Sequence, residues 1–145
     1  MLKLVHVFLA VFAVGANLTY ALWLRRAERE PEHLAYTIRG IRWIDRRFAN
    51  PAYALLLITG LSLAVLGDIP LARGWLLASL ALYLAAVVLG LFVWAPLARR
   101  QLAAVERGGA ADAEYQRLRR DSARLGVVTT AIVLGILALM VTKPF

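Results

Sequence analysis

Four long apolar runs alternate with clusters of arginine along this 145-residue chain. Fourteen of the seventeen Lys and Arg residues lie in two stretches, residues 25–47 and 99–124, and each stretch has an apolar run on both sides. A helix needs about 20 apolar residues to cross a hydrocarbon core about 30 Å thick. Buried soluble helices are the alternative for any single run. Four such runs in one short chain instead predict an all-α, polytopic membrane four-helix bundle that forms a single domain.

The predicted spans cover residues 4–24, 51–66, 74–97 and 125–141. The first run is longer than the core of a secretory signal peptide, and most of its flanking positive charge follows it, so we interpret it as a retained span. Asn50-Pro51 suits the start of the second span, because proline is well tolerated in a first helical turn. Trp75 and Trp94 lie near the ends of the third span, where indole rings favour the headgroup level.

The distribution of positive charge predicts the orientation of the bundle. The connection 67–73 carries one acid and one base, whereas the connections 25–47 and 98–124 carry seven arginines each. Because Lys and Arg in short loops favour the cytoplasmic side, we expect both basic connections in the cytoplasm and both termini outside. The expected location is a bacterial cell inner membrane. Anionic lipid headgroups are expected to bind Arg39, Arg42, Arg46, Arg117 and Arg120.

Both basic connections are predicted to be partly helical. In the first, apolar residues recur at helical spacing after Pro31, which suits a first helical residue. This amphipathic helix either lies along the inner headgroups or leads directly into the second span. In the second, Gly108-Gly109 breaks the pattern, and Asp112 is the expected N-cap of a helix that runs into the fourth span.

The two halves of the chain resemble each other. Each half has a span that ends near a tryptophan, a double arginine, and a basic helix with an aspartate beside an arginine. This pattern predicts two duplicated helix pairs related by an axis along the membrane normal, although basic cytoplasmic connections also converge in composition. The two aspartates, Asp45 and Asp121, are expected to pair with arginines nearby.

His6 is the candidate ligand residue of the chain. It lies about one turn inside the outer boundary of the first span, where an ionisable side chain is a functional candidate by default. A neutral imidazole can ligate haem iron or another metal ion. The alternative is an interfacial histidine bonded to water, a lipid headgroup or a carbonyl. The other histidine, His33, belongs to the opposite side of the membrane, so a bis-histidine haem would require His6 from two subunits, or a different second ligand.

Asn17 follows His6 by eleven residues, close to three helical turns, so both side chains can face one direction. Such a polar stripe lines a cofactor pocket or a water-filled path, or it hydrogen-bonds neighbouring helices. Small residues spaced by four are predicted to form packing faces, at Gly60/Ala64, Ala86/Gly90 and Ala131/Gly135.

Several function classes lack support in the sequence. The chain has no cysteine, so it contains no disulfide, thiolate metal site or catalytic thiol. No acidic or basic residue lies in the middle of a span, which argues against a proton-coupled transporter or an ion pump. There is no hydrolase motif and no phosphate-binding glycine loop. The membrane topology explains the net charge of +8, so nucleic-acid binding is not needed to account for it.

The whole chain resembles a bacterial family of predicted integral membrane proteins of unknown function. The matching residues are Leu4-Val5-His6, Gly15-Ala16-Asn17-Leu18-Thr19, Asp45-Arg46-Arg47-Phe48, Asn50-Pro51 and Thr59-Gly60. The first span is also distantly similar to that of copper-resistance D proteins and of the haem-containing membrane protoporphyrinogen oxidase. That resemblance implies haem b binding at His6. The chain lacks the tryptophan that the oxidase pattern places between the histidine and the glycine, and it lacks the membrane lysine.

These observations predict a small inner-membrane protein that binds haem b or a similar hydrophobic cofactor, with a redox-related role. His6 is the expected axial ligand of the haem iron, and Asn17 lies in the same cofactor-binding stripe. A non-catalytic scaffold that assembles as a homo-oligomer through its small-residue faces is the alternative from another class. A permeation unit for small solutes or ions is the third, and the sequence does not decide whether the protein is an enzyme.

Overall fold

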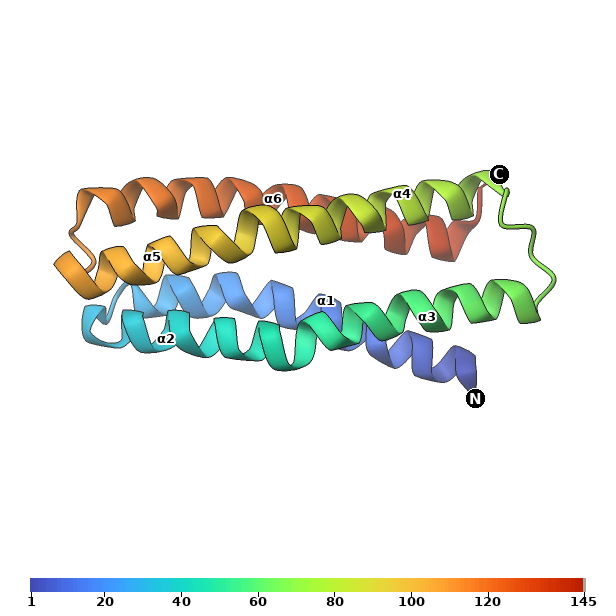
Figure 1. The fold of residues 1–145 in the computed structure, drawn as a ribbon, viewed down its shortest axis with the longest axis horizontal. Coiled ribbons are helices and arrows are strands. Elements are labelled where there is room, and N and C mark those ends of the chain that lie inside the picture. The colour runs from blue at the N-terminus through green and yellow to red at the C-terminus, as the bar shows by residue number, and fades with distance from the viewer. Residues whose placement is uncertain (145) are drawn as a thin grey trace.

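A computed structural model describes residues 1–144 as four long helices that run up and down the bundle (Figure 1). The first is α1 (Leu2–Ala27) and the last is α6 (Ala113–Thr142). The second is continuous through α2 (Pro31–Ile44), η1 (Asp45–Ala49) and α3 (Asn50–Leu66), and the third through α4 (Gly74–Val88), η2 (Leu89–Trp94) and α5 (Ala95–Gly108). All four are long and apolar enough to cross a membrane, so the predicted all-α four-helix fold is confirmed.

The two turns flanked by arginine-rich helix lie at one end of the bundle, and both termini lie at the other with the connection 67–73 (Figure 1). We call the first end the basic end, because the stretches that hold fourteen of the seventeen Lys and Arg residues reach it. The predicted helix starts at Pro31 and Asp112 and the break after Gly108 are confirmed. Of the two alternatives for the first amphipathic helix, α2 leads directly into the second span.

The two long middle helices each contain a π-helical turn immediately before an X-Pro pair. The N–H of Asn50 donates to the Asp45 carbonyl, and the N–H of Ala95 donates to the Gly90 carbonyl, five residues back in each case. A proline inside an α-helix has no N–H to donate and its ring clashes with the carbonyl four residues earlier, and the wider turn absorbs both defects. Asn50-Pro51 therefore does not begin a separate helix, because the helix passes through this pair without a break, and the start of the second span at this pair stays a prediction.

The two π-helical turns do not bear on the predicted duplication of helix pairs. They lie in the second and third helices, which occupy different positions in the two proposed repeats. The duplication stays a prediction.

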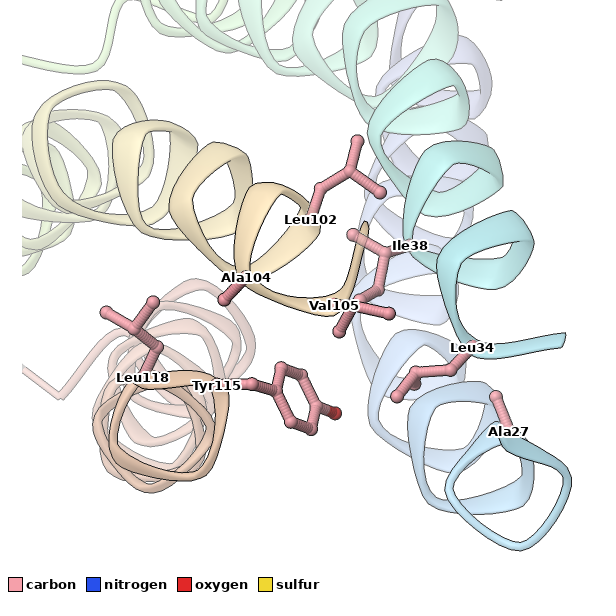
Figure 2. Close-up of a cluster of buried hydrophobic side chains, with 8 residues drawn as sticks. All are labelled: Ala27, Leu34, Ile38, Leu102, Ala104, Val105, Tyr115 and Leu118. Atoms are coloured by element: carbon pink, nitrogen blue, oxygen red, sulfur yellow. The ribbon is translucent and has the colours of Figure 1, made fainter. Parts of the chain in front are cut away.

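The largest buried apolar cluster lies at the basic end (Figure 2). α2 contributes Leu34 and Ile38, α5 contributes Leu102 and Val105, and the ring of Tyr115 from α6 points in among them. Burial raises the pKa of the Tyr115 phenol to about 12, so this group is uncharged at neutral pH. Apolar side chains meet here in the middle of four helices, as in a water-soluble bundle.

A smaller apolar cluster closes the opposite end of the bundle. Ala64 at the end of α3 packs against Trp75 and Leu76 at the start of α4, and Leu139 of α6 covers them. Trp75 is only 5% exposed, with the Lys143 ammonium 5.4 Å from its ring centre. The Trp75 side chain is buried inside the bundle and does not point outward; its depth at the headgroup level stays a prediction.

The middle of the bundle turns its apolar side chains outward. None of the most apolar stretch of α6 is buried, and large side chains such as Phe8, Phe92 and Val127 are exposed. α1 packs along α3 and α4 packs along α6, whereas the backbones of α3 and α4 stay more than 8 Å apart within the part of the chain that the structure describes and meet through long side chains. Lipid tails are as apolar as these side chains, so an apolar middle between two packed ends is typical of a membrane bundle.

The start of α6 offers a test of the cap. The Asp112 carboxylate accepts a hydrogen bond from the N–H of Tyr115 at 3.0 Å. We expect Asp112→Ala to lower the free energy of unfolding by about 1 kcal/mol, because an amide at the helix start loses its partner. Thermal unfolding in detergent checks this. Asp121→Ala removes an exposed acid from the same helix and should change stability by less than about 0.5 kcal/mol. An equal loss of unfolding free energy in the two variants would contradict the capping role of Asp112.

Candidate functional site

Polar side chains line the interface where α1 packs along η1 and α3. On α1 they lie at spacings that bring them to one helix face, and the facing residues come from the second helix. We call this set of residues the polar seam; its members are His6, Asn17, Tyr20, Asp45, Tyr53 and Thr59.

His6 is held against α3 by one hydrogen bond. Its Nδ1 lies 2.8 Å from the hydroxyl oxygen of Thr59, a buried residue. The same hydroxyl donates to the Leu55 carbonyl at 2.8 Å, so its oxygen is left to accept the proton on Nδ1. This assigns the proton to Nδ1 and leaves a lone pair on Nε2. In its neutral form, His6 therefore has one ring nitrogen in a hydrogen bond and the other with a lone pair that can act as a ligand.

Gly60 provides the space in which the imidazole lies. A Cβ atom added at Gly60 would lie 3.1 Å from Cε1 and 3.9 Å from Nε2 of His6. The ring therefore packs on the bare backbone of α3, and any side chain at Gly60 would push it away. Gly60 and Thr59 together determine where the ring lies, one through space and the other through a hydrogen bond.

The middle of the polar seam joins α1, α3 and α4. The side-chain amide of Asn17 donates to the Ala13 carbonyl at 3.1 Å and to the Tyr53 hydroxyl. From α4, the Tyr83 hydroxyl donates to the Tyr53 carbonyl at 2.9 Å. Tyr53 is thus the point where the two helix pairs are connected inside the apolar region. His6 and Asn17 both point toward α3, in agreement with their predicted common face.

The polar seam ends at Tyr20 and Asp45. Tyr20 is 6% exposed, and its hydroxyl has no hydrogen-bond partner within residues 1–144. The Asp45 carboxylate is close enough to act electrostatically on the phenols of Tyr20 and Tyr53. Asp45 forms no ion pair in the described chain, so its predicted pairing with a local arginine is wrong. Successive residues on a helix point in different directions, and Asp45 is half-buried while Arg46 is exposed.

The arginines at the basic end are divided between ion pairs and exposed positions. Arg119 of α6 donates to Glu28 after α1 at 2.5 Å, and Arg39 of α2 lies 3.5 Å from Glu106 of α5. Asp121 pairs with Arg124 at 4.0 Å, as predicted. Of the residues predicted to contact lipid, Arg39 is thus shared with α5 and Arg42 is half-buried beside α5, whereas three are exposed: Arg46, Arg117 and Arg120.

The predicted small-residue faces are used mainly inside the chain. Gly60 lies against His6, Ala64 is buried by the Trp75 cluster, and a Cβ added at Gly135 would meet Leu82 of α4 at 3.5 Å. A Cβ added at Gly90 would meet open space. The faces that were predicted to join copies of the chain therefore hold its own helices together at three of these positions.

A metal ion at His6 would have one protein ligand from this chain. Among residues 1–144, no three His, Asp or Glu side chains come together as possible metal ligands. His33 lies on α2 at the basic end, far along the bundle from His6. Within the described residues, His6 thus offers a single imidazole nitrogen, Nε2, as a possible ligand atom.

The sequence analysis placed His6 and Asn17 in this stripe; on the second helix it missed the seam residues Asp45, Tyr53 and Thr59. The spacing of Asp45 and Tyr53 to Thr59 could have predicted a common polar face, because one face of a continuous helix contains residues 45, 49, 52–53, 56 and 59–60. The assumed helix start at Asn50-Pro51 hid this face, since it separated Asp45 from Thr59.

Comparison with curated proteins and with solved structures gives no match. Residues 1–144 match the profile of a family described as "Predicted integral membrane protein (DUF2269)", and this match covers almost the whole chain. The four apolar helices agree with that description. The chain therefore belongs to the DUF2269 family of predicted integral membrane proteins.

Proposed function

We propose that this protein binds haem b, or a similar planar hydrophobic cofactor, through Nε2 of His6. The observation that carries the proposal is the hydrogen bond between His6 Nδ1 and Thr59, which leaves Nε2 free. Histidines that ligate metals almost always use the other ring nitrogen in a hydrogen bond of this kind, because it sets the tautomer and the orientation of the ring. An interfacial histidine bonded only to water or lipid would not need this arrangement.

Each residue around His6 has a role in the proposal. Thr59 orients the imidazole and sets its tautomer, and Gly60 gives the ring its place on α3. Asn17 lies about 16 Å further along α1, so it holds α3 against α1 through Tyr53 and does not contact the iron. Bound haem would supply one-electron chemistry, with a potential set by its axial ligands and by the low polarity around it.

The second axial ligand is proposed to come from another copy of the chain. His33 is at the opposite end of the bundle, and among the described residues no other histidine exists. A homodimer with one haem between two His6 side chains follows.

The bundle is proposed to cross a bacterial inner membrane with the basic end in the cytoplasm. The arginine distribution favours this orientation, and the water-soluble type of packing at the basic end supports it. Arg46, Arg117 and Arg120 are exposed and are suited to contact anionic headgroups.

An absorption spectrum tests the cofactor. Purify the full chain in detergent, add haemin, remove the excess and record the Soret region and the haem content. The expected result is a six-coordinate, bis-histidine spectrum with one haem for two chains. A spectrum identical to that of free haemin in the same detergent would reject the proposal.

Removing the Thr59 hydroxyl should weaken the haem complex without removing the ligand. We expect Thr59→Val to lower haem affinity about 10- to 100-fold, because the ring loses the partner that orients it. Haemin titration measures this. Thr129→Val is the matched control, because the Thr129 hydroxyl lies within 3.0 Å of a carbonyl of its own helix and contacts no histidine. The same affinity for both variants would contradict the role of Thr59.

A further inference from the structure

Asp45 is the one acid of the arginine-rich stretch 25–47 that has no basic partner within residues 1–144. Each of the other three acids lies within ion-pair distance of a basic side chain, in the pairs Glu28–Arg119, Glu30–Arg26 and Glu32–His33. Asp45 is half-buried in η1, which packs against α1, whereas its neighbours Arg46 and Arg47 are exposed. A carboxylate that leaves water needs a counter-charge, and the chain supplies none here.

The hydroxyl of Tyr20 is a second unsatisfied group in the same part of the bundle. Tyr20 is 6% exposed, and its buried oxygen has no hydrogen-bond partner among the described residues. The charge of Asp45 acts on this phenol and on that of Tyr53, so the carboxylate and the two phenols lie near one another. A buried hydroxyl without a partner is costly, and it indicates a functional role or a bound water or ion.

We propose that Asp45, Tyr20 and Tyr53 bind one monovalent alkali cation between α1 and the second long helix. Carboxylate and hydroxyl oxygens are the ligands that hard cations prefer. The site offers a single negative charge, and no three acidic or histidine side chains come together among residues 1–144, so a monovalent cation balances the charge and a divalent cation does not. The site lies at the end of the polar seam opposite to His6, so it does not depend on haem.

A proton or a water molecule would satisfy these groups less completely than a cation. A proton shared between Asp45 and Tyr20 requires a direct hydrogen bond, and the two side chains form none. A water molecule can bridge the two oxygens, but it leaves the carboxylate without a counter-charge. A cation between them accepts lone pairs from both oxygens and neutralises the carboxylate.

The π-helical turn η1 provides a further oxygen beside Asp45. The N–H of Asn50 donates to the Asp45 carbonyl, so the Arg46 carbonyl loses the donor that a regular α-helix would supply. Pro51 has no N–H to replace that donor. Turns of this kind are frequent at functional sites, and carbonyls freed from the helix pattern coordinate Na⁺ in other membrane proteins.

Cation-dependent stability tests the site. Thermal unfolding of the full-length protein in detergent would be compared in sodium chloride, potassium chloride and N-methylglucamine chloride at the same ionic strength. We expect one of the alkali chlorides to raise the melting temperature by about 3–6 °C over N-methylglucamine chloride, as for a cation at about tenfold its Kd. The salt that gives the larger rise identifies the ion. Equal melting temperatures in all three salts would overturn the proposal and would indicate a proton or a water molecule.

Variants assign the effect to the proposed ligands. Asp45→Asn should abolish the rise, because the amide has no charge, and Tyr20→Phe should raise the Kd of the cation about tenfold by removing one oxygen. Asp121→Asn is the matched control, because this acid also lies next to an arginine but is paired with Arg124 at 4.0 Å, and it should retain the rise. Retention of the rise in Asp45→Asn, or its loss in Asp121→Asn, would overturn the proposal.

A direct binding measurement covers the case in which Asp45→Asn does not fold. The wild-type protein would be titrated with radioactive sodium and with radioactive rubidium, which substitutes for potassium. We expect saturable binding of one ion per chain that an excess of the unlabelled alkali chloride displaces and N-methylglucamine chloride does not. Absence of saturable binding of both ions would overturn the proposal.

Discussion

The protein with His6→Ala is expected to show no bis-histidine Soret band after addition of haemin. His6 is the one histidine in the apolar part of the bundle, and Thr59 binds its Nδ1 so that Nε2 is free. Alanine removes the ligand but leaves the contacts of α1 with α3 through Asn17 and Tyr53. We expect the haem content of the purified variant to fall to the background of nonspecific partition into detergent, measured as the pyridine haemochrome.

His33→Ala is the control for this variant, because it removes the other histidine of the chain from an exposed position on α2. Its spectrum should match that of the wild type. Loss of the Soret band in His33→Ala with retention in His6→Ala would assign the haem to the basic end. Equal retention in both variants would mean that haem binds without either histidine, and the proposed ligand would be wrong.

Much of the fold was predictable because each helix carries its own signals. Arginine clusters mark the ends of the apolar runs, Pro31 and Asp112 start helices, and Gly108-Gly109 stops one. These signals act within a few residues, so a single sequence contains them. Proline inside a helix is the case in which the local rule failed. A π-helical turn lets the chain keep Pro51 and Pro96 in mid-helix, and nothing in the sequence distinguishes this solution from a helix start.

The polar seam was only half predictable for a different reason. The spacing of His6 and Asn17 places them on one face of α1, but which helix they face depends on how the helices rotate and pack. The partners Thr59 and Tyr53 come from a helix that is distant in sequence. Thr59 was recognisable as a polar residue in a span, whereas its bond to His6 required the tertiary structure.

The basic end is the part of the bundle where apolar burial itself should stabilise the fold. In the apolar middle, side chains exchange contacts with lipid for contacts with each other, at little gain. In the proposed orientation, the cluster around Leu34 and Tyr115 at the basic end is removed from water on folding, and ion pairs such as Arg119–Glu28 cross between helices around it. This cluster also connects the two helix pairs, because α2 and α5 pack against each other there, whereas the backbones of α3 and α4 stay more than 8 Å apart in the described chain.

Leu34→Ala should therefore lower the free energy of unfolding by about 2–5 kcal/mol, as expected for a fully buried leucine replaced by alanine. Leu84→Ala is the matched control, because this leucine lies in the apolar middle and is 52% exposed, and its loss should change stability by less than about 0.5 kcal/mol. Thermal unfolding of both variants in the same detergent measures the difference. If Leu34→Ala and Leu84→Ala lower the free energy of unfolding equally, the basic end is surrounded by lipid or detergent instead of water. That result would also remove the main structural support for placing this end in the cytoplasm.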